Sequence, residues 1–114
     1  MTKITISVRK HFKLEEIENL IYSMAEGSKY WCENSFKLGF ESTVKEILSG
    51  EYFEVLIDEE NKEHQFNLQK IKRGLTVMAK KEPKHFADII SGDTDQTTAD
   101  VLLQCSLFGE VIYG

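Results

Sequence analysis

Apolar positions recur along the chain with two different periods. Near the start, Ile4, Ile6 and Val8 alternate with polar residues, which predicts a half-buried strand over residues 3–9. The period then changes to that of a helix, and we expect a helix over residues 13–26. Its apolar stripe is predicted to consist of Leu14, Ile17, Leu20, Ile21, Met24 and Ala25, with Gly27 as the C′ residue.

The middle of the chain predicts a β-hairpin. Residues 52–57 are rich in β-branched and aromatic side chains, and the polar residues 58–63 form a turn before a return strand over residues 64–67. The alternation in the first strand is expected to turn Val55 and Ile57 toward the core. The segment before the hairpin is ambiguous, because its Tyr-Trp-Cys run could begin a strand and residues 43–48 fit either a short helix or a β segment.

Three helices are predicted after the hairpin. The first covers residues 68–81 with Asn67 as its N-cap, and the second starts at Pro83 and buries Phe86, Ile89 and Ile90. A last helix ends at Gly109, and Thr97 or Thr98 is expected to cap its start, although Asp95 is also explained by capping this helix. A tail over residues 111–113 could add an edge strand.

The order of these elements predicts the fold class. Adjacent hairpin strands followed by clustered helices favour α+β, with an antiparallel sheet of three to five strands and three or four helices packed on one face. A length of 114 residues fits one domain over residues 1–114. The predicted core consists of Ile4, Ile6, Leu14, Ile17, Leu20, Ile21, Val55, Ile57, Phe66, Ile71, Leu75, Val101, Leu102 and Phe108.

Charge and hydropathy narrow the function classes. The formal net charge is -5, which argues against a basic nucleic-acid footprint over the whole surface, so no direct nucleic-acid binding is expected. No apolar run approaches the roughly 18–20 residues of a spanning helix, and the start lacks the apolar core of a signal peptide. These features predict a soluble, cytoplasmic protein without membrane contact.

Acidic and basic residues are separated into different segments of the chain, which the net charge does not reveal. Residues 69–85 carry six basic side chains and one acid, whereas residues 51–63 carry six acids and one Lys, and residues 86–114 carry five acids and no base. Such runs either coat a solvated surface or steer a partner. In the second interpretation Lys70, Lys72 and Arg73 bind an anion such as phosphate. The acidic surface would then consist of Glu54, Asp58, Glu59, Glu60, Glu63, Asp93 and Asp95.

Catalytic and metal-binding constellations are weak in this sequence. The three histidines lie in different predicted elements and form no zinc spacing, and Cys32 and Cys105 are far apart, as expected for two free thiols in a reducing compartment. The aspartates between residues 93 and 100 lack the Gly and the terminal Glu of a calcium loop. We therefore expect no enzyme activity, no metal and no cofactor.

Tyr30 and Trp31 form the most informative pair. Aromatic side chains just after a helix end can anchor the core. Alternatively they stack on a nucleobase or anchor a protein interface, and Arg73 of the basic helix would then pair with a phosphate. The sequence alone leaves both interpretations open.

The chain combines the central Tyr30-Trp31 pair with the terminal motif Leu-Phe-Gly-Glu-x-x-Tyr-Gly at residues 107–114. In these features it resembles a family of small uncharacterised bacteriophage proteins, and the resemblance covers roughly residues 28–114. It carries no catalytic residue with it. What it implies is a phage or prophage product that acts in the cytoplasm of a host bacterium.

Two function hypotheses follow, with a third beside them. The first is an inhibitor that binds a bacterial anti-phage defence protein, such as a CRISPR effector, through an acidic surface that competes with nucleic acid. The second is a sponge that sequesters a nucleotide immune signal between the aromatic pair and the basic helix. The third is a phage accessory protein without a defence target. A homodimer is also possible, with Tyr113 and its neighbours pairing as edge strands.

Overall fold

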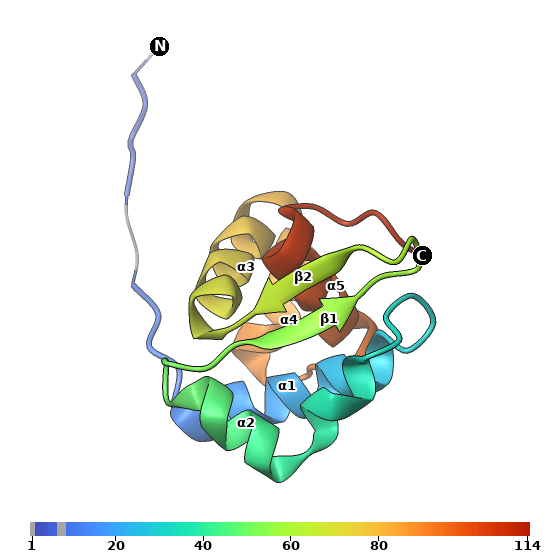
Figure 1. The fold of residues 1–114 in the computed structure, drawn as a ribbon. Helices are drawn as coiled ribbons and strands as arrows, with labels where there is room; N and C mark the ends of the chain where they lie inside the picture. The colour runs from blue at the N-terminus through green and yellow to red at the C-terminus, as the bar shows by residue number, and fades with distance from the viewer. Residues whose placement is uncertain (1, 7–8) are drawn as a thin grey trace.

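Helix α5 (Gln96–Phe108) runs through the centre of the fold, and the other elements pack around it (Figure 1). Every residue from Thr98 to Leu107 is buried, including the polar residues Asp100, Gln104 and Ser106. A helix that is enclosed on all sides has no solvent-facing stripe, so its polar side chains must find partners inside the protein. This requirement organises the site described below.

The computed structural model describes residues 2–6 and 9–114 and confirms the α+β class. Within these residues there are five α-helices and one short 3₁₀ helix, where three or four helices were predicted, and a sheet of two strands rather than three to five. The elements are α1 (Leu14–Gly27), η1 (Ser35–Gly39), α2 (Glu41–Leu48), β1 (Glu54–Ile57), β2 (Glu63–Phe66), α3 (Leu68–Lys81), α4 (Pro83–Ser91) and α5. None of the helices in the described ranges is long and apolar enough to cross a membrane.

Helices α1 and α3 cover α5 and agree closely with their predicted ranges. Asn67 caps α3 as predicted, accepting a hydrogen bond from the Lys70 N–H at 2.9 Å. The prediction of Gly27 as a C′ residue was wrong, because Gly27 is the last residue of α1. A Cβ at Gly27 would collide with the backbone carbonyl of Gln96, so the missing side chain allows α1 and the start of α5 to touch.

The hairpin β1–β2 is antiparallel, as the sequence predicted, and its register pairs Leu56 with His64. Its facing was predicted wrongly, because Glu54, Leu56 and Asp58 are buried whereas Val55 and Ile57 are half-buried. The carboxylates of Glu54 and Asp58 can face inward because each has polar partners. These are Tyr52 and Lys37 for Glu54, and His64 with two backbone N–H groups for Asp58. Periodicity of apolar residues cannot detect an inward stripe that carries acids.

The N-terminal prediction was also wrong. Ile4 and Ile6 are 91% and 77% exposed, and residues 2–6 form no strand and run away from the body of the protein (Figure 1). Val8 lies outside the described residues. Leu14 is exposed as well, since it stands at the first position of α1 before the helix meets the core. The alternating pattern predicted a strand, but a strand also needs a hydrogen-bonded neighbour, and residues 2–6 have none within the described structure.

The remaining uncertain segments have definite structures. Residues 41–48 form helix α2, and the predicted strand at Tyr30-Trp31-Cys32 is reduced to one isolated bridge between Cys32 and Asp58. Asp95, and neither threonine, caps α5. The tail over residues 111–113 is not a strand, because two of its N–H groups are bonded to a side chain of α5. Phe108 and Phe86 are only half-buried, and Ile90 is exposed.

Candidate functional site

The indole ring of Trp31 lies in the core, with 2% of its surface exposed. Its Nε1–H donates to Asp100 Oδ1 at 2.6 Å, which satisfies a carboxylate in the middle of α5. The ring of Tyr113 stacks on the indole at a centroid distance of 5.0 Å, and Phe108 lies 5.5 Å away at a tilt. The structure therefore places Trp31 as a core anchor, and its stacking face is already occupied by Tyr113.

Tyr30 completes this arrangement at the surface. Its side chain is partly exposed, but its hydroxyl donates to Asp100 Oδ2 at 2.5 Å. Burial, followed by the hydrogen bond to Asp100, raises the pKa of Tyr30 to about 12. The hydroxyl of Tyr30 is thus hydrogen-bonded to an internal partner, while the residue itself is 56% exposed.

Gln104 is a polar residue that the sequence analysis missed. Its Oε1 accepts from the N–H groups of Ile112 and Tyr113, both at 2.8 Å, and its Nε2 donates to Asp100 Oδ2 at 3.2 Å and to the carbonyl of Tyr113, also at 3.2 Å. These bonds hold the C-terminal tail over Trp31. The available signal was the sequence of α5 itself, whose apolar residues leave no polar face and so force Asp100 and Gln104 inward.

The three predicted phosphate ligands lie on α3. Lys72 lines a groove beside α1, whereas the Arg73 guanidinium lies 3.0 Å from where a Cβ of Gly109 would stand. Lys70 is half-buried near the start of α3. Among the described residues, the hydroxyl of Tyr30 and the indole N–H of Trp31 are bonded to Asp100 and not to these side chains.

The groove beside α1 has a volume of about 710 Å³. Its floor is apolar and comes from α1 and α3, with Ile71 and Leu75 among its residues, while Lys10, Lys72 and Lys80 lie along it. Lys72 and Lys80 are two turns apart on one helix, so the positive charge is spread along the groove rather than gathered at one end. Sequence analysis named only Lys72 of this set.

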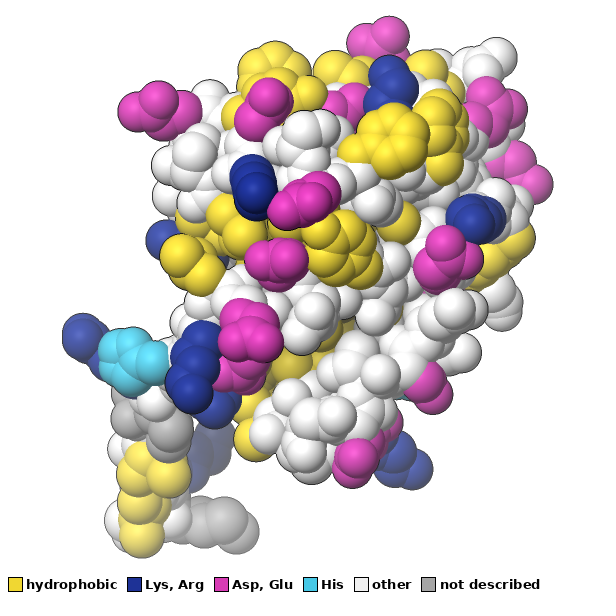
Figure 2. Space-filling model, turned by 90° about the horizontal axis from the view of Figure 1, so that it is seen from below, with side chains coloured by type: hydrophobic (Ala, Val, Ile, Leu, Met, Phe, Trp, Pro, Cys, Tyr) yellow, Lys and Arg dark blue, Asp and Glu magenta, His cyan; other side chains and the backbone are white. Residues whose placement is uncertain are grey.

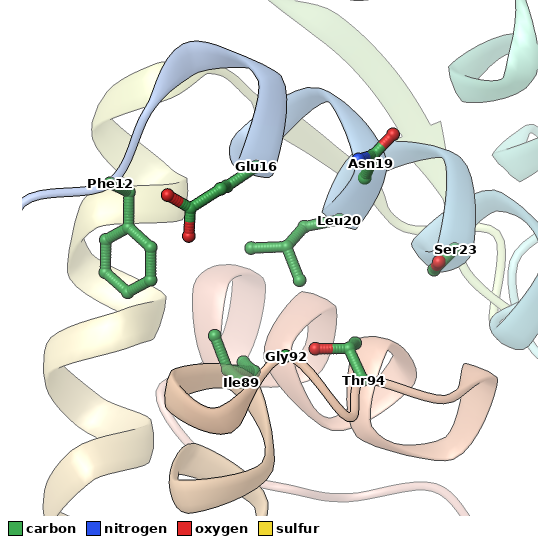
Figure 3. A pocket seen from close by; sticks show the side chains of 8 residues that line it. All are labelled: Phe12, Glu16, Asn19, Leu20, Ser23, Ile89, Gly92 and Thr94. Atoms are coloured by element: carbon green, nitrogen blue, oxygen red, sulfur yellow. The ribbon is translucent and has the colours of Figure 1, made fainter.

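A second, smaller pocket lies between α1 and the loop that follows α4 (Figure 3). It measures about 210 Å³, and Leu20 of α1 faces Ile89 and Thr94 across it. The one carboxylate that lines it, Glu16, accepts a hydrogen bond from the Lys13 N–H at 3.2 Å. Small-molecule sites commonly measure about 300–1,000 Å³, so this pocket is a weaker candidate than the groove.

Asp58 organises the tip of the acidic hairpin. Its Oδ1 accepts from the N–H groups of Glu60 and Lys62 at 2.8 and 3.0 Å, and its Oδ2 is 2.8 Å from His64 Nε2. Burial opposes the charge of Asp58, but the bonds from His64 and the two N–H groups outweigh it and hold the pKa below its usual value. The turn is therefore fixed by a carboxylate that points inward.

The other predicted acids divide into exposed and structural groups. Glu59, Glu60 and Glu63 are exposed around the hairpin turn, where Lys62 pairs with Glu60 at 3.5 Å. Glu54 is buried, accepts from the Tyr52 hydroxyl and lies 3.8 Å from Lys37 Nζ.

Asp93 and Asp95 lie in the loop before α5, where each has a local partner. Asp93 accepts from the Ser91 hydroxyl at 3.1 Å, and Asp95 accepts from the Thr98 N–H at 2.7 Å. Elsewhere, on the face seen in Figure 2, acidic side chains alternate with apolar and basic ones. The exposed acids of the hairpin turn are thus the predicted acidic residues least occupied by internal contacts.

The two cysteine thiols are buried, and His64 and His85 are each paired with a neighbouring side chain. Burial raises the pKa values of Cys32 and Cys105 to about 11, so neither is a reactive thiolate near neutral pH. His64 serves Asp58, and His85 Nδ1 lies 2.9 Å from the Thr98 hydroxyl. Within residues 2–6 and 9–114 no three His, Cys, Asp or Glu side chains come together as metal ligands.

Comparison with protein-family models, curated proteins and solved structures finds no match to this chain. The site is therefore interpreted from its own geometry. Two surfaces remain as candidates for binding, namely the acidic turn of the hairpin and the lysine-lined groove.

Proposed function

We propose that this chain is a bacteriophage-encoded, non-enzymatic protein that inhibits a bacterial anti-phage defence protein, such as a CRISPR effector, by binding it directly in the host cytoplasm. The observation that carries the proposal is the acidic hairpin turn, where Glu59 and Glu60 are exposed on a loop held by Asp58 and Glu63 is exposed at the adjoining start of β2. A rigid, exposed cluster of negative charge suits a basic nucleic-acid channel on a partner.

The burial of Trp31 favours the inhibitor hypothesis over a nucleotide sponge built on the aromatic pair. A nucleotide sponge built on the aromatic pair needs a free ring face, and Tyr113 stacks on that ring. The buried thiols, with pKa values near 11, also favour binding over nucleophilic catalysis. The acidic turn needs no rearrangement before it meets a partner.

The test is capture followed by competition. The immobilised chain is incubated with host lysate, the retained protein is identified, and its nucleic-acid binding is titrated with the chain. We expect competition by the wild type, a loss of at least tenfold with the Glu59→Lys/Glu60→Lys/Glu63→Lys variant, and no loss with a control that reverses three other exposed acids, Glu46, Asp88 and Glu110. Equal competition by both variants would contradict the proposal.

A nucleotide sponge remains the second candidate, and the groove is what favours it. Its volume of about 710 Å³ is within the range of small-molecule sites, and Lys72 and Lys80 offer charges for phosphates. A nucleotide at a hundredfold excess over its dissociation constant raises the unfolding free energy by about 2.7 kcal/mol. A thermal shift with cyclic or ADP-ribose-derived nucleotides, lost in Lys72→Ala and kept in Lys84→Ala, would favour the sponge over the inhibitor.

A further inference from the structure

The segment Thr2–Ile6 has the pattern of a strand and no partner. Ile4 and Ile6 project from the same side of an extended chain and are more exposed than any other large hydrophobic side chain of the described residues. Figure 1 shows this segment running away from the body of the protein. Two isoleucines left in water at alternate positions carry an unfavourable hydration cost that a neighbouring strand would remove.

The sheet offers an open edge for such a strand. The Asp58 N–H donates to the Lys62 carbonyl at 3.0 Å, so by alternation Leu56 and His64 also direct their backbone groups toward each other. Glu63 and Gln65 therefore direct theirs to the outer edge of β2. Among the described residues no hydrogen bond joins these groups to another segment, whereas the outer edge of β1 is met by the Glu33 N–H, 3.1 Å from the Ile57 carbonyl.

Electrostatic attraction favours the outer edge of β2 over the lysine-lined groove as the binding site for the N-terminal segment. Residues 2–13 contain four basic side chains and no acid, and the hairpin segment over residues 51–63 exposes four acids, Glu51, Glu59, Glu60 and Glu63, against one Lys. The groove is lined by Lys72 and Lys80 of α3, which would repel a basic segment. An incoming strand with positive flanks is thus attracted to β2, where Glu63 is exposed.

We propose that Thr2–Ile6 of one copy adds as a third strand to the outer edge of β2 in a second copy, and that the exchange is reciprocal. A two-fold arrangement uses each segment and each edge once, so the assembly closes as a dimer. Each sheet then has three strands, and the exposed edge that would otherwise invite uncontrolled pairing is covered. Glu59 and Glu60 in the turn stay free, whereas Glu63 belongs to both surfaces, so the variants that test the dimer leave Glu63 unchanged.

The test is the molar mass in solution, measured by light scattering over a wide range of concentration. We expect the wild type to have twice the 13.1 kDa of the chain, and the Ile4→Ser/Ile6→Ser variant to have the mass of one chain. Thr5→Ser, a change of similar chemistry on the other face of the segment, should remain dimeric. High salt should weaken the wild-type dimer, because the attraction is partly electrostatic.

A substitution on the edge tests the acceptor. Gln65→Pro removes an N–H that faces away from β1, so the hairpin can keep its pairing while the added strand loses a hydrogen bond and meets the proline ring. We expect a folded monomer with an unchanged far-ultraviolet circular dichroism spectrum. A monomeric wild type, a dimer that survives in both the Ser and Pro variants, or a monomer whose residues 2–6 are protected from hydrogen exchange by their own chain would each overturn the proposal.

Discussion

Replacing Asp100 with Asn should destabilise the protein strongly although the change alters one atom. The Asp100 carboxylate is buried and accepts three hydrogen bonds, from Trp31, Tyr30 and Gln104. Asparagine keeps a single acceptor oxygen, and its NH₂ group faces donors. If the remaining oxygen serves Trp31, the donor of Gln104 loses its partner and Tyr30 must turn its hydroxyl to accept.

The magnitude follows from the number of bonds lost. A hydrogen bond to a charged group contributes about 1.5–3 kcal/mol, so losing one or two of the three costs about 1.5–6 kcal/mol. In a chain of this length about 1 kcal/mol corresponds to about 4 °C in Tm, so the variant should melt about 6–24 °C lower. The tail that Gln104 holds should loosen at the same time, because Gln104 is itself oriented by Asp100.

The assay is urea unfolding followed by the fluorescence of Trp31, which is the sole tryptophan of the chain. The matched control is Asp88→Asn, an exposed aspartate whose replacement should change the free energy of unfolding by less than about 0.5 kcal/mol. In Asp100→Asn the native emission should also shift toward that of a solvated indole. An Asp100→Asn variant as stable as the control, with unchanged emission, would refute the reasoning about this network.

Three further predictions concern other parts of the fold. The pKa of Asp58 lies below its usual value, so its carboxylate stabilises the fold at neutral pH, and this stabilisation is lost as the pH falls through the folded-state pKa. In thermal unfolding between about pH 7 and pH 3, the Tm of Asp58→Asn should therefore fall less on acidification than the Tm of the wild type. An equal fall in both proteins would contradict this. Cys32 and Cys105 should react with a thiol reagent only on unfolding, since a pKa of about 11 leaves about one thiolate in a thousand at pH 8, and fast labelling of the native protein would contradict the burial. Gly74→Ala should destabilise by about 1–3 kcal/mol in chemical denaturation, because its Cβ would stand 2.9 Å from the Ser106 Cα, and a neutral result would contradict the close crossing of α3 and α5.

The helices and the hairpin were predictable because their signals are local. The apolar stripe of α3, its Asn67 cap and the Pro83 start of α4 each depend on residues within one or two turns. The facing of β1 was not predictable in the same way, since Glu54 and Asp58 turn inward only where Lys37 and His64 are present to receive them. Lys37 comes from η1 and His64 from the partner strand β2, so neither partner is part of the alternating pattern of β1 itself.

The candidate site shows the same limit more sharply. The sequence identified Tyr30 and Trp31 but left open whether they bind a ligand or anchor the core, because the answer lies some 70 positions away at Asp100. Gln104 was missed, because the apolar residues around it in α5 indicate that it is buried but do not indicate which groups it bonds. In contrast, the exposed acids of the hairpin turn were found from charge alone, since their position in a turn already predicts exposure.

Hydrogen–deuterium exchange of the complex with the captured host protein tests the central claim most directly. The claim is that the chain binds through the acidic hairpin turn while Tyr30 and Trp31 serve the core. We predict that binding slows exchange over residues 58–63 and leaves the lysine-lined groove of α3 unchanged. Protection of the groove, with exchange over residues 58–63 unaffected, would contradict the account.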